Sequence, residues 1–211
     1  MSSFRKFLLV LVAGALSACA SVETATRNAS YSGDGADVMP RSIDIQAVRV
    51  VVPETLKVSE ANMYYPGGDI VWRGDPVGDR HAQVKAIFET AMQQGISRVS
   101  KGAVPVVLDA QVTRFHALSE KARYTVGGVH ALQFTIILRN PETLEALGAP
   151  RNIKADFKAL GGGEAIAAER VGITQKSRIT DHLADVIQAE LTQSEGYKPA
   201  KLGLIGAINQ M

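Results

Sequence analysis

The chain has 211 residues, of which 46% are hydrophobic and 21% are charged, and its 23 lysine and arginine residues nearly balance its 21 aspartate and glutamate residues. Two of the basic residues, Arg5 and Lys6, lie in an N-terminal segment that we expect to be removed, which leaves the mature chain formally neutral. Proteins that bind nucleic acid normally carry a basic surface, so this charge balance argues against that class.

The N-terminal segment has the layout of a secretory signal peptide. Arg5 and Lys6 precede an apolar run over residues 7–15, and small residues follow up to Ala18. A transmembrane helix is the alternative, but an apolar stretch of about a dozen residues is shorter than the roughly 20 needed to span a bilayer. Cleavage by an ordinary signal peptidase after Ala18 is a second alternative.

The only cysteine of the chain favours a lipid anchor, because a lone thiol has no partner for a disulfide bond. Leu16-Ser17-Ala18-Cys19 resembles the lipobox of bacterial lipoproteins. The resemblance implies cleavage before Cys19, diacylglycerol on its thiol, and a fatty acyl chain such as palmitate on the new amine. Alanine rather than aspartate at position 20 resembles the pattern of lipoproteins sent to the outer membrane.

The chain divides into four parts by composition. We expect a signal peptide over residues 1–18, and an acylated cysteine followed by a small, polar tether over residues 19–42, with a root-mean-square span of roughly 25 Å. Residues 43–195 are expected to form one folded domain that faces the periplasm. Residues 196–211 form a C-terminal tail.

The first elements of the domain are a strand and a helix. Alternating apolar residues from Ile43 up to Pro53 predict a strand, and a short strand is predicted over residues 69–73. A helix is predicted over residues 80–98, because its apolar residues recur with helical spacing. These apolar residues are Val84, Ile87, Phe88, Ala91 and Met92.

Three strands and a second helix follow. Apolar and polar residues alternate cleanly over residues 106–113, 132–139 and 152–159, which places Asp156 on a wet face. One dry and one wet face are typical of an antiparallel sheet covered on a single side. The second helix is predicted over residues 174–194. The expected fold class is therefore α+β, a two-layer sandwich with a mainly antiparallel sheet and two amphipathic helices packed on one face.

Three histidines are candidates for chemistry. His81, Asp75 and Asp79 could hold a metal ion, but aspartates that cap the start of a helix are the favoured interpretation. His116 and His130 lie near the ends of neighbouring strands and are interpreted as surface residues. We therefore expect no metal site and no cofactor.

Two glycine clusters complete the search for motifs. Residues 161–163 are all glycine, but Glu164 follows them instead of the lysine and hydroxyl residue of a phosphate-binding loop. They are interpreted as a flexible connection between a strand and a helix, and Gly127 with Gly128 as a bulge or hairpin turn. No GxSxG nucleophile motif occurs in the sequence. We expect that the protein is not an enzyme.

Two apolar features leave alternatives open. Trp72 with Tyr64 and Tyr65 forms either an exposed binding patch or part of the core, and the core is favoured. The tail contains aliphatic residues that either pack on the domain or dock on another protein. These residues are Leu202, Leu204, Ile205 and Ile208.

The order of elements over residues 43–194 resembles a known group. A strand that ends in Val50-Val51-Val52, a segment that reaches Trp72, a helix, three strands and a closing helix are similar to the auxiliary lipoproteins of ABC-type envelope transporters. They are more loosely similar to the lipoprotein partner of the lipopolysaccharide-insertion pore. The resemblance implies no catalytic residues, so Cys19 is the one functional position that it carries over.

We therefore expect a non-enzymatic lipoprotein anchored to the outer membrane through Cys19. It would serve envelope transport or assembly by binding a membrane-protein partner. A carrier of a lipid or small apolar ligand is the alternative, and it requires an apolar cavity between helices and sheet. An enzyme would require a cleft that gathers His116, His130 or His81 with carboxylates.

Overall fold

Strand β1 (Ile43–Val51) is the first element of the computed structural model, which describes residues 42–202. The predicted signal peptide, Cys19, nearly all of the tether and the end of the tail lie outside the described residues. The elements after β1 are β2 (Ile70–Val71), α2 (Arg80–Ser97), β3 (Val104–His116), α3 (Glu120–Arg123), β4 (Gly128–Arg139), β5 (Arg151–Lys154), β6 (Phe157–Ala159), α4 (Gly162–Arg170) and α5 (Gln175–Thr192).

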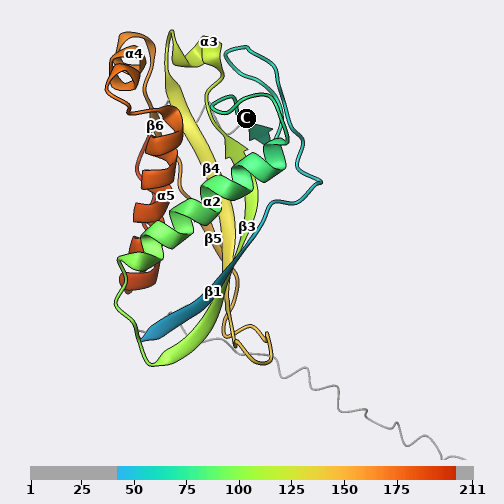
Figure 1. The fold of residues 1–211 in the computed structure, drawn as a ribbon, viewed down its shortest axis with the longest axis vertical. Coiled ribbons are helices and arrows are strands. Elements are labelled where there is room, and N and C mark those ends of the chain that lie inside the picture. The colour runs from blue at the N-terminus through green and yellow to red at the C-terminus, as the bar shows by residue number, and fades with distance from the viewer. Residues whose placement is uncertain (1–41, 203–211) are drawn as a thin grey trace, which may run out of the picture. The chain divides into compact units, whose positions relative to one another are not determined.

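Both predicted long helices are confirmed, as α2 and α5. Each begins at a side-chain cap, since Asp79 accepts a hydrogen bond from the Ala82 amide of α2 and Thr174 accepts one from the Ser177 amide of α5. The two helices pack closely at Gly95, where a Cβ atom would lie 2.6 Å from the Ala184 carbonyl oxygen. In Figure 1, α2 and α5 cross the same side of the strands.

The sheet is mixed, so the expectation of a mainly antiparallel sheet is wrong. Its strand order is β1-β3-β4-β5, with β2 beside β3 and β6 beside β4. β1 and β2 run parallel to β3, whereas β4 is antiparallel to β3, β5 and β6. The reason is the connection through α2: a helix between two strands returns the chain to the end where it started, so the strands run in the same direction. The alternation of apolar and polar side chains shows which face of a strand is buried, but it does not show in which direction the strand runs.

The core joins the two long helices to the sheet. Phe88 of α2 meets Phe115 of β3 and Phe134 of β4 edge to face, with ring centroids 6.1 and 5.3 Å apart. Trp72 meets Phe115 in the same way at 5.6 Å. All four side chains are buried and belong to one hydrophobic cluster with the inner residues of α5. Aromatic pairs in this geometry stabilise a core beyond the area that they bury.

The strand predicted over residues 152–159 is interrupted. β5 ends at Lys154 and β6 begins at Phe157, and Asp156 between them is buried instead of exposed. Its carboxylate accepts a hydrogen bond from the Leu132 amide at 2.9 Å and so takes the place of a backbone partner. Burial raises the pKa of this carboxyl group. The prediction of a continuous strand with Asp156 on a wet face is therefore wrong, because a side chain can replace a ladder bond.

Two short helices were not predicted. α3 begins after Ser119, whose hydroxyl accepts a hydrogen bond from the Ala122 amide. α4 begins at Gly162, inside the glycine run that we expected to be a flexible connection. Both helices lie at the end of the sheet where β4 starts and β6 ends (Figure 1).

Candidate functional site

An open groove of about 650 Å³ lies at the end of the sheet where β4 starts and β6 ends. We call it the glycine groove. Its walls come from the loop before β2, the connection from α3 to β4, and the connection from β6 to α4. The lining residues are Tyr64, Tyr65, Leu118, residues 125–129, Lys158, Ala159 and residues 161–164.

Two glycines bring the walls of the groove together. A Cβ atom on Gly161 would lie 2.1 Å from the Gly127 nitrogen, so only glycine allows the two backbones to approach this closely. Gly127 has a φ of +74°, which other residues rarely adopt. The run of glycines at 161–163 does connect a strand, β6, to a helix, α4, as predicted; within it, Gly161 lies against Gly127 and Gly162 starts α4.

Exposed aromatic side chains form the rim of the groove. Tyr65 is 70% exposed and Tyr64 is 42% exposed, and Val126 across the groove is 73% exposed. The Lys121 ammonium group lies 4.7 Å from the centre of the Tyr64 ring, where a cation is attracted to the aromatic face. The predicted aromatic cluster is thus divided, because Trp72 is fully buried, as favoured, while both tyrosines face solvent.

The loop that carries the tyrosines is held in place. The Ser119 hydroxyl donates to the Met63 carbonyl oxygen at 2.6 Å, and the Lys121 amide donates to the Asn62 side chain at 2.7 Å. Farther back, the buried Arg80 guanidinium donates to Glu60 at 2.6 Å. These contacts hold the part of the loop that precedes the tyrosines in place without a ligand, which lowers the entropic cost of binding.

The candidate metal ligands do not come together. Asp79 caps α2, which confirms the favoured interpretation, while Asp75 accepts from the Trp72 indole at 2.9 Å and pairs with Lys176. His81 Nε2 lies 3.1 Å from the Leu56 carbonyl oxygen. Within residues 42–202, no three potential ligands form a cluster that could hold a metal ion.

The interpretation of His116 and His130 as surface residues is wrong. His130 is 1% exposed and His116 is 8% exposed. Burial is the main cause that lowers the pKa of His130 to about 3 and that of His116 to about 4, and nearby arginines add to it. Both rings are therefore neutral at pH 7. The signal for His130 was present in the sequence, because it shares the strand parity of Leu132 and Phe134, which face the core.

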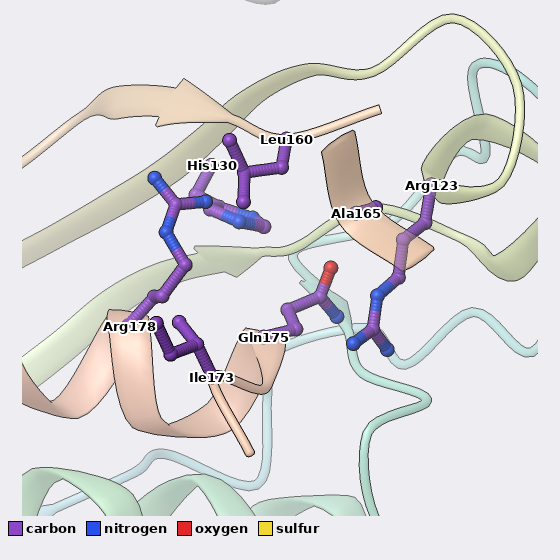
Figure 2. Close-up of a pocket in the computed structure, with 7 residues that line it drawn as sticks. All are labelled: Arg123, His130, Leu160, Ala165, Ile173, Gln175 and Arg178. Carbon is purple, nitrogen blue, oxygen red and sulfur yellow. The ribbon is translucent and has the colours of Figure 1, made fainter. Parts of the chain in front are cut away.

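His130 borders a second, much smaller cavity. Figure 2 shows its ring and the Gln175 amide facing the same space between β6 and α5. The cavity volume is about 10 Å³, which is the size that one water molecule needs. His130 Nδ1 has no hydrogen-bond partner in the described part of the chain. Arg178, on the same cavity, donates to the Lys158 carbonyl oxygen at 3.2 Å.

Comparison with known proteins places the chain in a family. The model of a family of unknown function, DUF6778, matches residues 43–207. The chain belongs to this family. No curated protein matches the chain. In the part of this DUF6778 protein that the structure describes, none of the helices combines the length and the apolar character needed to cross a membrane.

Solved structures show distant similarity to this DUF6778 protein. A "putative lipoprotein" from Caulobacter crescentus CB15 is 14% identical, with 69% of this chain and 87% of that chain covered and a TM-score of 0.33. Protein XCC0632 from Xanthomonas campestris, of family DUF330, is 11% identical over 71% and 82% of the chains, with a TM-score of 0.40. The PelC dodecamer from Paraburkholderia phytofirmans is 15% identical over 72% and 90%, with a TM-score of 0.31.

Proposed function

We propose that this protein is a non-enzymatic accessory lipoprotein of envelope transport or assembly, anchored to the outer membrane through Cys19, that binds a membrane-protein partner at the glycine groove. The observation that carries the proposal is the rim of the groove, where Tyr64, Tyr65 and Val126 are exposed and the loop with the tyrosines is hydrogen-bonded to Ser119. Tyrosine is enriched among the residues that dominate binding energy at protein interfaces. A preformed, partly apolar concavity with aromatic edges suits such a partner.

The position of the groove supports presentation to a partner. Ile43, the first residue of β1, pairs with Val104 at the start of β3, while the groove lies beyond His116 at the other end of that strand. A strand of 13 residues spans about 40 Å at a rise of about 3.3 Å per residue. The groove is therefore at the end of the sheet farthest from the point where the N-terminal segment joins the domain.

A carrier of a small apolar ligand is the second candidate. The space between the helices and the sheet, where we expected its cavity, holds Phe88, Phe115 and Phe134, which are at most 1% exposed. The glycine groove itself favours this candidate, since its volume of about 650 Å³ falls in the range of about 300–1,000 Å³ typical of ligand pockets.

Affinity capture from detergent-solubilised envelopes tests the proposal. The full-length protein is compared with Tyr65→Ala and Val126→Asp, and with Val77→Asp as a control at a position that is 94% exposed and outside the groove. We expect wild type and the control to recover the same envelope membrane protein. The two groove variants should recover at least about tenfold less, as loss of a hot-spot residue predicts. Equal recovery by all four proteins would rule out the groove as the partner site.

A further inference from the structure

The end of the described chain runs beside the elements that build the glycine groove. After α5, the Tyr197 amide donates to the Glu190 carboxylate at 2.7 Å. The Tyr197 ring meets His182 edge to face at 6.3 Å, and His182 stacks on Phe157 at 4.2 Å. Phe157 directly precedes Lys158 and Ala159, which line the groove. Two successive ring contacts, Tyr197 with His182 and His182 with Phe157, therefore connect the end of the chain to β6.

The residues that follow are apolar and uncharged. After Lys201 the sequence reads Leu-Gly-Leu-Ile-Gly-Ala-Ile-Asn-Gln-Met, with no ionisable side chain. The family model extends to residue 207, beyond the last described residue, so it includes the first six residues of this segment. The segment contains four large aliphatic residues, Leu202, Leu204, Ile205 and Ile208. Exposure of such side chains to water is unfavourable, and burial of one of them contributes about 1.5–3 kcal/mol.

The segment is long enough to reach the groove, and the apolar lining of the groove suits its aliphatic side chains. Leu204 is seven positions after Tyr197, and an extended chain over seven steps spans up to about 24 Å. Leu118 and Ala159 provide buried apolar lining, and Val126 adds an exposed apolar edge. The Gly127–Gly161 contact leaves backbone rather than side chains along the groove, which lets a segment that contains Gly203 and Gly206 approach closely.

We propose that residues 202–208 of the same chain dock in the glycine groove and are displaced when the partner binds. We infer the docking from the lining of the groove and from the position and composition of the chain end. The displacement rests on the proposed function. A segment joined to the groove by a few residues has an effective concentration of the order of millimolar, so it covers the exposed rim whenever the partner is absent.

Site-specific photo-crosslinking tests the docking in the full-length protein in its membrane. Benzoyl-phenylalanine replaces Val126 on the groove rim or, as a control, Leu147, which is 44% exposed and pairs with Leu138 at the opposite end of β4. After irradiation, mass spectrometry identifies the linked peptides. We expect Val126 to link to the peptide with residues 202–211 and Leu147 not to do so. Absence of this link, or equal links from both positions, would overturn the docking. The wild-type tail is present throughout, so the result does not depend on a tail variant that folds.

Two tail variants of equal charge separate the docking from the proposed function. Ile205→Asp should reduce the Val126 link about tenfold or more, because it removes one buried aliphatic side chain, whereas Asn209→Asp should change it less than about twofold. Ile205→Asp should also raise recovery of the partner. An unchanged link in Ile205→Asp overturns the docking. A link that responds as expected, with no partner recovered by any variant, upholds the docking and overturns the proposed function.

Discussion

Gly161 and Gly127 lie so close together that a single methyl group cannot be inserted between them. A Cβ atom at position 161 would meet the Gly127 nitrogen and Cα at 2.1 and 2.3 Å, so the loops must separate. Both walls of the groove depend on this contact, because one glycine precedes β4 and the other precedes α4.

Gly161→Ala should therefore destabilise the protein by about 2 kcal/mol or more, as overpacking does in a close-packed contact. Gly163→Ala is a matched control, because a Cβ atom there meets nothing within 4 Å and the residue lies in the first turn of α4. The control should be neutral or stabilising by up to about 1 kcal/mol. Urea unfolding monitored by circular dichroism measures both. Equal stability of the two variants would contradict the tight contact.

Gly95→Ala should loosen the contact between α2 and α5. A Cβ atom at Gly95 would lie 2.6 Å from the Ala184 carbonyl oxygen, which belongs to the backbone of a long helix and cannot rotate away. We expect a loss of about 2 kcal/mol in the free energy of unfolding, although alanine is the better helix former by about 1 kcal/mol. A thermal melt that shows stabilisation would show that the helices separate at no cost.

Acid should destabilise the protein through its buried histidines. The pKa values of His130 and His116 in the folded chain are about 3 and about 4, below the ordinary value of 6.5. Between these limits the unfolded chain binds more protons than the folded chain, so the free energy of unfolding falls as pH drops below about 6.5. From pH 7 to pH 5 each histidine should contribute a loss of about 2 kcal/mol.

Urea unfolding at pH 7 and pH 5 measures this loss. Protonation of Asp156 has the opposite effect on the free energy of unfolding, because the pKa of this carboxyl group is raised in the folded chain. Carboxyl groups with lowered pKa values, such as those of Asp75 and Asp109, affect stability only at more acidic pH. Burial also lowers the pKa of His182, so three histidines share the pH dependence. Replacement of His130 by leucine should remove the part of about 2 kcal/mol that belongs to His130 and leave no unpaired Nδ1 in the core. A pH dependence that persists unchanged in that variant would assign the effect to other groups.

Cys19→Ala should release the protein from membranes. Without the thiol, no diacylglycerol can be attached, and the affinity of about 0.8 kcal/mol per buried CH₂ group is lost. Fractionation of cell envelopes and labelling with a radioactive fatty acid measure the change. Ser21→Ala, two residues away, is the control and should remain membrane-bound and labelled. Membrane retention of Cys19→Ala equal to that of the control would exclude the anchor.

The sequence predicts those elements of the fold whose period is visible in one segment. Helices α2 and α5 and strands β1, β3 and β4 follow from spacing, because burial of one face requires it. The parallel direction of β1 does not follow from spacing, since it depends on the path of the chain through α2. The break at Asp156 does not follow from spacing either, because a carboxylate that replaces a backbone acceptor leaves the alternation of apolar and polar residues unchanged.

The groove could not be predicted from the sequence for a different reason. Tyr64, Gly127 and Gly161 are far apart in the chain, and each has an ordinary local explanation as part of an aromatic cluster, a turn or a connection. The structure alone brings them into one concavity. Val126, which is the most exposed residue of the rim, lies in a turn whose sequence gives no sign of a partner.

The parallel pairing of β1 also sets an order of folding. Ile43 lies opposite Val104, about 60 residues later, so the first strand has no neighbour until the central strand has been made. Pairing over such a separation closes a long loop and is slow. If residues 1–18 are the signal peptide that the sequence predicts, the chain crosses a membrane before it folds, and a first strand that cannot pair until its neighbour has been made suits that passage.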